Sequence, residues 1–398
     1  MLNRVHIKGF KSISDANISL GRVNVFIGTN GAGKSNLLEA IAMLSSSFEG
    51  GIDYERLARR GARLSSPEIF RSSLKNKERL KTFSIEAEMG EMVYSSQVTS
   101  VSKFNYHSES LVSKDGAKLA GRSNVGARID GVPLKGKLDP TKSIIAPYRA
   151  FGEDASARGV LEDIEKYGIF SLSTPILRGV AEDKSQKSPL GLYGGRLAEA
   201  FNEVARDQGN REHLQRFFAL MDWFRSIGVT TEVDKTLISD KVTLGRTVLT
   251  YRDKFMKGSF DHLYGYDVSE GALYVLFVLV LLTHKDAPNI FALDNVDTAL
   301  NPGLVRQFMS HIIELVCASE KKQIFITTHN PTTLDAIDIF NPEHRLFVVQ
   351  RMEDGQTEFR RIEPPDGMTK DGWQNQYFGL KMSEIWLSGA MGGLPTGF

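Results

Sequence analysis

The sequence predicts an α/β protein in which buried strands alternate with helices. Three short apolar runs, at residues 23–27, 290–293 and 323–328, have the length and composition of strands that are buried on both faces. Apolar residues at helical spacing follow two of these runs, at residues 36–44 and 305–316. This alternation is typical of a mixed or mostly parallel sheet that is flanked by helices.

Composition limits the class of protein. The chain has 398 residues, ordinary apolar and charged fractions and a formal net charge of +1, so it is not globally basic as many nucleic-acid-binding proteins are. The single Cys317 cannot form an internal disulfide, and no secretory signal is visible at the start, so we expect a cytoplasmic protein. The longest apolar run, residues 273–282, is too short to span a bilayer.

The first part of the chain predicts a small sheet that leads into a phosphate-binding loop. Its strands are expected at residues 5–7, 18–20 and 23–27. Residues 28–35 then read Gly-Thr-Asn-Gly-Ala-Gly-Lys-Ser, which is the full spacing of a P-loop. The glycines allow backbone N–H groups to approach phosphate oxygens at the start of a helix. The expected phosphate-binding residues are Gly28, Asn30, Gly31, Ala32, Gly33, Lys34, Ser35 and Asn36.

Two residues of this loop have specific expected roles. Lys34 is expected to reach the β- and γ-phosphates of a nucleoside triphosphate, and the hydroxyl of Ser35 is expected to bind Mg²⁺. The sequence therefore predicts a P-loop NTPase that uses ATP or a related nucleotide with Mg²⁺.

A basic interval follows at residues 56–81, where nine Lys and Arg side chains face few acids. Two interpretations remain open. The interval contacts phosphates of a nucleic acid or a neighbouring nucleotide, or it is a solvated surface or a protein interface. The residues that would contact nucleic acid are Arg56, Arg59, Arg60 and Arg63.

The middle of the chain changes its periodicity twice. Short alternating segments at residues 83–147 predict an antiparallel β subdomain, and residues 153–227 have the periodicity of a helical insertion. Strand-like pieces return at 230–233, 242–244 and 248–251.

A second group of motifs lies in the last third of the chain. Ser269, Glu270 and Gly271 open an apolar helix, and the strand at 290–293 ends in Asp294. A carboxylate at the C-terminal edge of a buried strand can hold the Mg²⁺ bound by Ser35. The strand at 323–328 ends at His329.

The order of these motifs resembles that of the ABC-type ATPases. Residues 7–12, Ile-Lys-Gly-Phe-Lys-Ser, together with residues 30–40, are similar to the SMC/RecF/OLD-like branch. Segments at 188–191, 380–386 and 389–395 are similar to stand-alone ATPases of that branch, including those of anti-phage defence systems. About 70 residues follow His329, too few for the Toprim nuclease domain of OLD-type proteins.

The resemblance implies one ABC-type ATPase head over residues 1–398, with the signature, Walker B and His-loop lobe at 265–398. Two heads of this family close around two ATP molecules, which implies a homodimer or higher oligomer. Ser269 and Gly271 would then contact the γ-phosphate held by the other head, while Asp294 supports Mg²⁺ and His329 senses the γ-phosphate. Residues 299–301 would form the turn between heads.

Asn295 departs from the family pattern, which has a glutamate directly after the Walker B aspartate. An amide can hold the attacking water but cannot take its proton, so hydrolysis is expected to be slower by about 10²–10⁴-fold. Asp297, which also lies in the turn between heads, and Glu162 are alternative acids. Neither Gln97 nor Gln186 has a context that identifies it as the glutamine of the ABC-type Gln loop.

Three functions follow from these expectations. The leading one is an ATPase that assembles through ATP-bound heads and controls a separate effector protein. The resemblance to stand-alone ATPases suggests anti-phage defence as its setting. A RecF-like repair factor would bind DNA in an ATP-stimulated manner through Arg59 and Arg60. A non-hydrolysing nucleotide-binding scaffold would release no phosphate.

Overall fold

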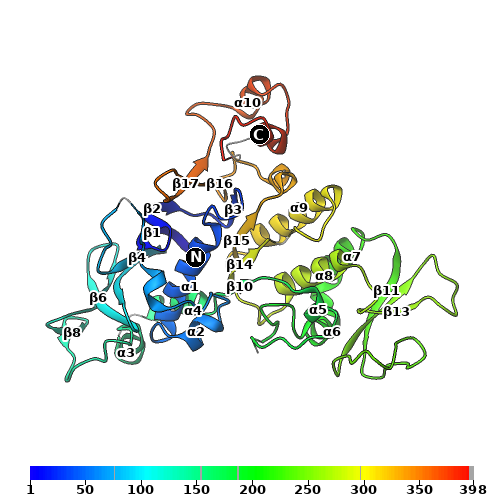
Figure 1. The fold of residues 1–398 in the computed structure, drawn as a ribbon, viewed down its shortest axis with the longest axis horizontal. Helices are drawn as coiled ribbons and strands as arrows, with labels where there is room; N and C mark the ends of the chain where they lie inside the picture. Colours follow the sequence, from blue (N-terminus) through cyan, green and yellow to red (C-terminus); the bar gives the residue numbers. More distant parts are fainter. Residues whose placement is uncertain (76, 153–154, 186–187, 296, 394–398) are drawn as a thin grey trace.

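The fold is known from a computed structural model, which describes residues 1–75, 77–152, 155–185, 188–295 and 297–393. A six-stranded sheet lies near the middle of the molecule (Figure 1), in the order β10-β14-β15-β3-β16-β17. The first five strands in this order run parallel, and β17 pairs antiparallel with β16. The strands are β3 (Val23–Ile27), β10 (Ile169–Phe170), β14 (Ile290–Asp294), β15 (Gln323–Thr328), β16 (His344–Arg351) and β17 (Thr357–Ile362).

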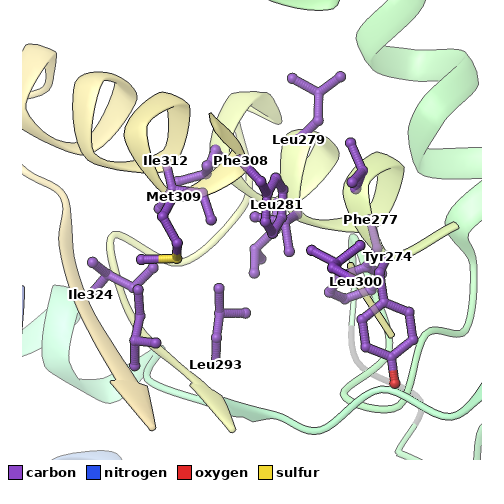
Figure 2. Packing of buried hydrophobic residues seen from close by; sticks show 14 of the residues in the cluster. Tyr274, Phe277, Leu279, Leu281, Leu293, Leu300, Phe308, Met309, Ile312 and Ile324 are labelled. Carbon is purple, nitrogen blue, oxygen red and sulfur yellow. The ribbon is translucent and has the colours of Figure 1, made fainter. Parts of the chain in front are cut away.

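The central sheet is buried on both faces, as its apolar strands predict. Helices α8 (Glu270–Thr283) and α9 (Pro302–Ala318) cover one face. Figure 2 shows Phe308 and Met309 of α9 near Leu293 and Ile324 of the strands. Helix α8 is apolar all round because α6 and α7 pack on it as well.

Helix α1 (Lys34–Glu49) covers the opposite face of the central sheet. It lies between Phe26 and Phe325 of that sheet and the apolar side chains of a second, antiparallel sheet. Being enclosed on both sides, α1 is buried almost completely. The helix that carries the P-loop lysine is therefore held by two sheets.

The second sheet has eight strands in the order β2-β1-β4-β5-β6-β7-β8-β9. The prediction of a separate small sheet at the start of the chain is wrong, because β1 pairs with both β2 and β4, whereas β3 enters the central sheet. The β strands of residues 83–133 thus extend the N-terminal hairpin. The strands are β1 (Leu2–Phe10), β2 (Ile13–Ser19), β4 (Phe83–Met89), β5 (Met92–Ser100), β6 (Phe104–Ser113), β7 (Lys118–Ser123), β8 (Gly126–Ile129) and β9 (Val132–Pro133).

Most of the remaining helices lie between β9 and the strand that begins at Phe224. They are α3 (Ile145–Phe151), α4 (Ala155–Glu165), α5 (Thr174–Leu177), α6 (Leu197–Arg206) and α7 (Arg211–Phe218), with the short 3₁₀ turn η2 (Gln208–Asn210). Helix α2 (Tyr54–Ala58) and the 3₁₀ turn η1 (Pro67–Phe70) precede β4. The periodicity did not reveal β10, which is too short to alternate and pairs with β14 at the sheet edge.

A three-stranded antiparallel sheet follows, in the order β11-β12-β13. It consists of β11 (Phe224–Thr230), β12 (Val248–Asp253) and β13 (His262–Tyr264). Of the strand expected at 230–233 only Thr230 belongs to β11, and residues 242–244, also expected as a strand, have no regular secondary structure.

The chain ends with η3 (Pro331–Ala336), α10 (Lys370–Gln376) and α11 (Met382–Leu387). Within the described residues, no helix combines the length and apolar character that crossing a membrane requires.

Candidate functional site

The P-loop connects the C-terminal end of β3 to the start of α1. Lys34 is 7% exposed, and its Nζ donates hydrogen bonds to the carbonyl oxygens of Gly28, at 2.6 Å, and Thr29, at 3.0 Å. Burial lowers the pKa of the Lys34 ammonium, and the charges of Asp294 and Asp297 oppose this shift. The loop therefore encloses a lysine that two carbonyls hold in place.

Residues of β16 and β17 pack against the P-loop and hold its backbone. The sequence motifs did not reveal these residues. Thr357 of β17 donates from Oγ1 to the carbonyl oxygen of Ala32 at 2.8 Å. A Cβ on Gly33, whose φ is +107°, would lie 2.1 Å from that same Thr357 hydroxyl. A Cβ on Gly28 would lie 2.0 Å from the carbonyl oxygen of Val349. Both positions therefore require glycine because β16 and β17 pack directly on the loop.

Asp294 places its carboxylate next to the P-loop serine. Strand β15 lies between β14 and β3, so the C-terminal ends of all three strands meet at one edge of the sheet. The Ser35 hydroxyl lies 3.5 Å from Asp294 Oδ2, and Thr327 donates a hydrogen bond to Asp294 Oδ1.

A hydroxyl and a carboxylate this close fit Mg²⁺, which prefers oxygen ligands and takes the rest from water and phosphate. Three or more His, Cys, Asp or Glu side chains do not gather into a metal-binding group anywhere in the described residues. Ser35 and Asp294 are thus the pair that could hold the ion.

A cavity of about 210 Å³ lies in front of the P-loop. Its walls combine residues 30–36 with Asp294, Asn295 and Arg63. Arg63 donates from Nε to Glu39 at 2.6 Å and from Nη2 to Asn36 at 3.1 Å. The sequence had placed Arg63 only among the possible nucleic-acid contacts. The structure brings it to the cavity through the fold of the segment that follows α2.

Asn295 has a backbone conformation that few residues adopt. Its φ is +54°, in the left-handed region where asparagine and aspartate are tolerated better than most side chains. Its N–H donates to the carbonyl oxygen of Thr327 at 3.1 Å. Asparagine therefore suits the backbone of this turn, but it lacks a carboxylate that could accept a proton.

Asp297 does not line the P-loop cavity. It is 2% exposed, and its Oδ2 accepts hydrogen bonds from the hydroxyls of Thr328 and Thr333. Its Oδ1 is buried and has no hydrogen-bond partner in the described structure. Because Thr328 and Thr333 lie on either side of His329 in the chain, Asp297 connects the turn after β14 to the His329 loop.

The start of α8 lies outside the P-loop cavity of the same chain. Ser269 is the N-cap, accepting a hydrogen bond from the N–H of Ala272 at 3.4 Å. Thr174 donates a hydrogen bond to Glu270, so that carboxylate is held at Thr174. A Cβ on Gly271 would lie 3.0 Å from the carbonyl oxygen of Ala299, so the helix start packs against the turn at 299–301.

The remaining candidates are dispersed. His329 directly follows β15, is exposed and does not line the cavity. Glu162 lies exposed on α4 and Gln97 exposed on β5, and neither lines it. Gln186 lies outside the described residues.

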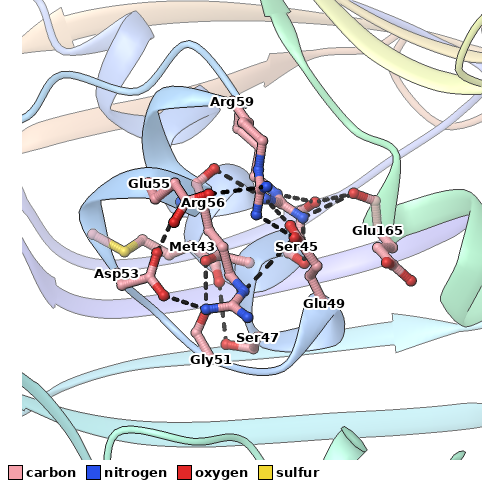
Figure 3. Close-up of polar contacts among 12 residues, drawn as sticks. Met43, Ser45, Ser47, Glu49, Gly51, Asp53, Glu55, Arg56, Arg59 and Glu165 are labelled. Carbon is pink, nitrogen blue, oxygen red and sulfur yellow. Dashed lines mark hydrogen bonds and ion pairs between the residues drawn. The ribbon is translucent and has the colours of Figure 1, made fainter. Parts of the chain in front are cut away.

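The four arginines considered as nucleic-acid contacts, Arg56, Arg59, Arg60 and Arg63, all form ion pairs with carboxylates of the protein. Arg60 is 2% exposed and donates to Ser45, at 2.6 Å, and to Glu49, at 2.7 Å. Figure 3 shows Arg56 and Arg59 among the acids Glu49, Asp53 and Glu55, with which they form ion pairs. Of the two interpretations left open, contact with phosphate does not fit Arg60, whose guanidinium is buried and bonded within the protein, and carboxylates neutralise the charges of Arg56 and Arg59.

Two family models match parts of the chain. Residues 1–118 match the family described as "AAA ATPase domain". Residues 201–335 match the family described as "AAA domain, putative AbiEii toxin, Type IV TA system". The first match contains the P-loop, and the second contains Ser269, Asp294 and His329.

Among curated proteins, an uncharacterized protein of Methanocaldococcus jannaschii, MJECL10, is 41% identical over 51 residues. This segment is 13% of the present chain and 23% of that relative, so the match spans less than a quarter of the relative.

Solved structures of SMC heads align with most of the chain. An SMC head bound to the C-winged helix domain of ScpA has a TM-score of 0.52 at 14% identity, covering 92% of this chain and 99% of that one. An SMC head domain from Thermotoga maritima has a TM-score of 0.46 at 16% identity, with 91% and 99% covered. The first of these likenesses confirms the predicted ABC-type α/β head fold.

Proposed function

We propose that the chain is an ABC-type ATPase of the SMC/RecF-like branch, that it binds ATP and Mg²⁺ at the P-loop and that it joins another copy of itself through the bound nucleotide. In this proposal the joined heads control a separate effector protein in the cytoplasm. One observation carries the proposal: the predicted phosphate-binding groups form two separate sets. The P-loop cavity holds Lys34, Ser35 and Asp294, while Ser269 and Gly271 lie outside it.

Each set has a distinct part in the proposed mechanism. When phosphate is bound, Lys34 exchanges its carbonyl partners for phosphate oxygens, and Ser35 and Asp294 hold the ion that neutralises phosphate charge. The exposed N-terminus of α8 offers N–H groups to the γ-phosphate held by the other copy. The position of Glu270 at Thr174 keeps its charge away from such a phosphate.

Hydrolysis in this proposal is slow. Asn295 lines the cavity at the position where the family has glutamate, and an amide cannot accept a proton from water. Asp297 is a poor substitute, because it is buried and bonded to two threonine hydroxyls. We assign Asp297 to the positioning of the His329 loop, where His329 would sense the γ-phosphate. A slow ATPase suits a switch better than a motor.

Two comparisons support an effector partner. The family matched by residues 201–335 is described with a toxin of a type IV toxin–antitoxin system, which agrees with a role in anti-phage defence. The SMC head of similar fold was solved in complex with a domain of another protein, ScpA. A protein that responds to ATP-driven joining of heads is therefore the proposed partner.

The proposal is tested by sedimentation and phosphate release on the purified full chain. With ATP and Mg²⁺ we expect a dimer or higher oligomer, which returns to the smaller species when EDTA is added. Lys34→Ala should remain the smaller species and release no phosphate. A wild-type chain that stays monomeric and binds no partner protein under every nucleotide condition would contradict the proposal.

A non-hydrolysing scaffold is the second candidate, and Asn295 is the observation that favours it. Phosphate release by the wild type that Lys34→Ala abolishes would reject the scaffold. Activity that arises only in Asn295→Asp would support it. The RecF-like alternative loses the support it drew from Arg59 and Arg60, since both are paired within the protein.

A further inference from the structure

A cavity of about 640 Å³ lies at the β9 end of the eight-stranded sheet, and we call it the sheet-end cavity. Its walls come from β6, β7, the start of β8 and the segment at 136–140. Figure 1 shows β6 and β8 at the left edge of the molecule, on the opposite side from α8 and α9. The sheet-end cavity and the P-loop cavity share none of the described lining residues. Its volume lies within the usual range of small-molecule sites, about 300–1,000 Å³.

The lining of the sheet-end cavity is positively charged. The described residues that line it include Arg122, Lys137 and His107 but no acid. Asp139 is next to the lining residues in the chain, but its Oδ1 accepts hydrogen bonds from the N–H and the hydroxyl of Thr141, both at 2.8 Å. Within the described residues, Lys137 forms no ion pair with a carboxylate. The cavity therefore lacks an anion of its own to balance its cations.

Arg122 is the buried cation of this cavity. Its side chain is 8% exposed, and its guanidinium lies over the ring of Tyr106, 5.7 Å from the ring centre. Its Nη1 donates to the carbonyl oxygens of Asp139, at 3.0 Å, and Lys142, at 2.6 Å, and lies 3.8 Å from Oε2 of Glu109. Within the described residues, Nε and Nη2 donate no hydrogen bond. One nitrogen thus holds the guanidinium in place, and two remain for a ligand.

Glu109, which lies behind Arg122 and does not line the cavity, is a weak counter-charge. Burial raises the pKa of Glu109 to about 7, so this carboxyl is only partly ionised near neutral pH. Its Oε1 accepts hydrogen bonds from the hydroxyls of Tyr94, at 2.8 Å, and Ser143, at 2.6 Å. Arg122 therefore keeps positive charge for an anion in the cavity.

The rest of the lining suits the uncharged part of a small organic molecule. Its apolar groups include Tyr106, Ala127, Leu138 and Pro140, and its polar groups include Ser123 and Asn124. A guanidinium binds a carboxylate or a phosphate through paired N–H donors. A ligand that fits has one such anionic group for Arg122 and a small apolar body for the remaining wall.

The sheet-end cavity is connected to the C-terminal end of α1, the helix that begins at the P-loop. Tyr106 donates a hydrogen bond from its hydroxyl to Oγ of Ser47, in the last turn of α1, at 2.7 Å. Lys142, whose carbonyl oxygen accepts from Arg122, forms an antiparallel bridge with Gly51, two residues after α1. A ligand on Arg122 would thus contact groups tied to one end of α1 while a nucleotide binds at the other.

We propose that the sheet-end cavity binds a small organic anion, a molecule with one carboxylate or phosphate group and an apolar body, through Arg122 and Lys137. The binding itself does not rest on the proposed function. Its effect on nucleotide binding does, because that effect passes along α1 to the P-loop. By thermodynamic linkage, an anion that alters ATP affinity is bound with an affinity that ATP alters by the same factor.

The test uses benzoate and phenyl phosphate as probes, benzamide as the uncharged analogue of benzoate, and ligand-observed NMR titration of the full chain. We expect the wild type to bind at least one of the two anions and not benzamide, and the anion that binds more tightly identifies the anionic group. Arg122→Gln should weaken this binding at least tenfold, as expected for the loss of a hydrogen bond to a charged group. Lys137→Gln, at an exposed position, should weaken it about threefold and replaces Arg122→Gln if that variant does not fold.

Arg128 supplies the matched control. It lies on β8 next to Ala127, but successive side chains of a strand point to opposite faces, and Arg128 is exposed and does not line the cavity. Arg128→Gln removes the same charge as Arg122→Gln from the same sheet and should leave binding of the probes unaltered.

A second measurement tests the connection to α1. Calorimetry with ATP and Mg²⁺ is carried out with and without the anion that binds, at a saturating concentration. We expect ATP affinity to change at least twofold in the wild type and to stay constant in Arg122→Gln or its replacement. Unchanged ATP affinity in the wild type would overturn the connection to α1.

Four outcomes would overturn the site itself. The wild type binds neither anion, or benzamide binds as tightly as the anions do. The folded variants Arg122→Gln and Lys137→Gln bind the anions as the wild type does, or Lys34→Ala abolishes binding because the probes occupy the P-loop. Absence of ATP binding in the wild type would instead contradict the proposed function and leave the anion site in place.

Discussion

Helices α1 and α8 both begin at residues that are predicted to bind phosphate, but their N-termini are built differently. The start of α1 has Lys34, a cavity of about 210 Å³ and a carboxylate 3.5 Å from Ser35. The start of α8 has Ser269 as an exposed N-cap and a neighbouring acid, Glu270, that is bonded elsewhere. In the proposed mechanism the start of α1 binds a nucleotide by itself, whereas the start of α8 binds a phosphate that another molecule brings.

The two helices are also anchored differently. The buried residues of α8 are all apolar or aromatic. By contrast, α1 buries Glu39, Ser45 and Ser47, which form hydrogen bonds with side chains from other elements. The comparison therefore predicts that changes of charge and pH act mainly on α1 and on the polar groups of the sheet that packs against it, and that changes at α8 act on association between chains.

Lys34→Ala should have the largest effect. It removes about two charge-assisted hydrogen bonds to phosphate, at about 2 kcal/mol each, so ATP affinity should fall by about 10³-fold. Calorimetry with ATP and Mg²⁺ measures the change, and Lys257→Ala is the exposed control. Retained affinity in Lys34→Ala would remove the distinction between the two helix starts.

Ser269→Asp should weaken ATP-dependent association by about 100-fold and leave ATP binding by a single chain unchanged. Aspartate caps a helix as well as serine does, so α8 keeps its N-cap, but the added charge repels a phosphate from another chain. Ser269→Thr is the matched neutral control. Concentration-dependent sedimentation gives the association constant, and equal association of both variants would argue against a phosphate at α8.

The pH dependence of stability should be due in part to Glu109. Burial raises the pKa of Glu109 to about 7, although Ser143 and Tyr94 donate hydrogen bonds to it, and Tyr106 links the same region to Ser47 of α1. A carboxyl whose pKa is raised in the folded protein stabilises the fold at low pH and loses that contribution as pH rises through 7.

Between pH 5.5 and 7.5 this contribution to the free energy of unfolding should fall by about 2 kcal/mol. Urea unfolding of the wild type and of Glu109→Gln across this range measures it, because glutamine does not titrate. Parallel pH profiles for the two proteins would show that Glu109 does not titrate as proposed.

Asn295→Asp should have the smallest effect, an increase in phosphate release of about tenfold, since a carboxylate can accept a proton from water. Aspartate also tolerates the φ of +54° at this position. Glutamate would reach further but add about 1–3 kcal/mol of backbone strain. Steady-state phosphate release at saturating ATP compares the wild type, Asn295→Asp and Asn295→Glu. No gain in either variant would mean that Asn295 does not limit hydrolysis.

Strong local patterns predicted much of this molecule. The P-loop spacing identified the start of α1, and the apolar runs identified β3, β14 and β15, because doubly buried strands leave a continuous apolar pattern. Short or tertiary features were missed. Strand β10 has only two residues, and β1 and β2 belong to a different sheet from β3 through long-range pairing that spacing does not encode.

The supporting residues of the site were missed for the same reason. Thr357 lies far along the chain from Ala32, yet their hydrogen bond fixes the P-loop. The charge run at residues 56–81 gave no sign that Arg60 is buried or that Arg71 lines a cavity, since local sequence does not reveal which carboxylates come close. The fold class and the P-loop could be predicted from local sequence patterns, whereas the pairing of the arginines with carboxylates could be seen only in the tertiary structure.

A mixture of two defective variants tests the division between the helix starts most directly. Lys34→Ala keeps the α8 end, and Ser269→Asp keeps the P-loop, so one intact composite site can form only when the two variants meet. With ATP and Mg²⁺, sedimentation should find each variant alone in the smaller species and a nucleotide-dependent complex in the mixture. A mixture that sediments as the sum of its separate components, while the wild type associates, would contradict the account.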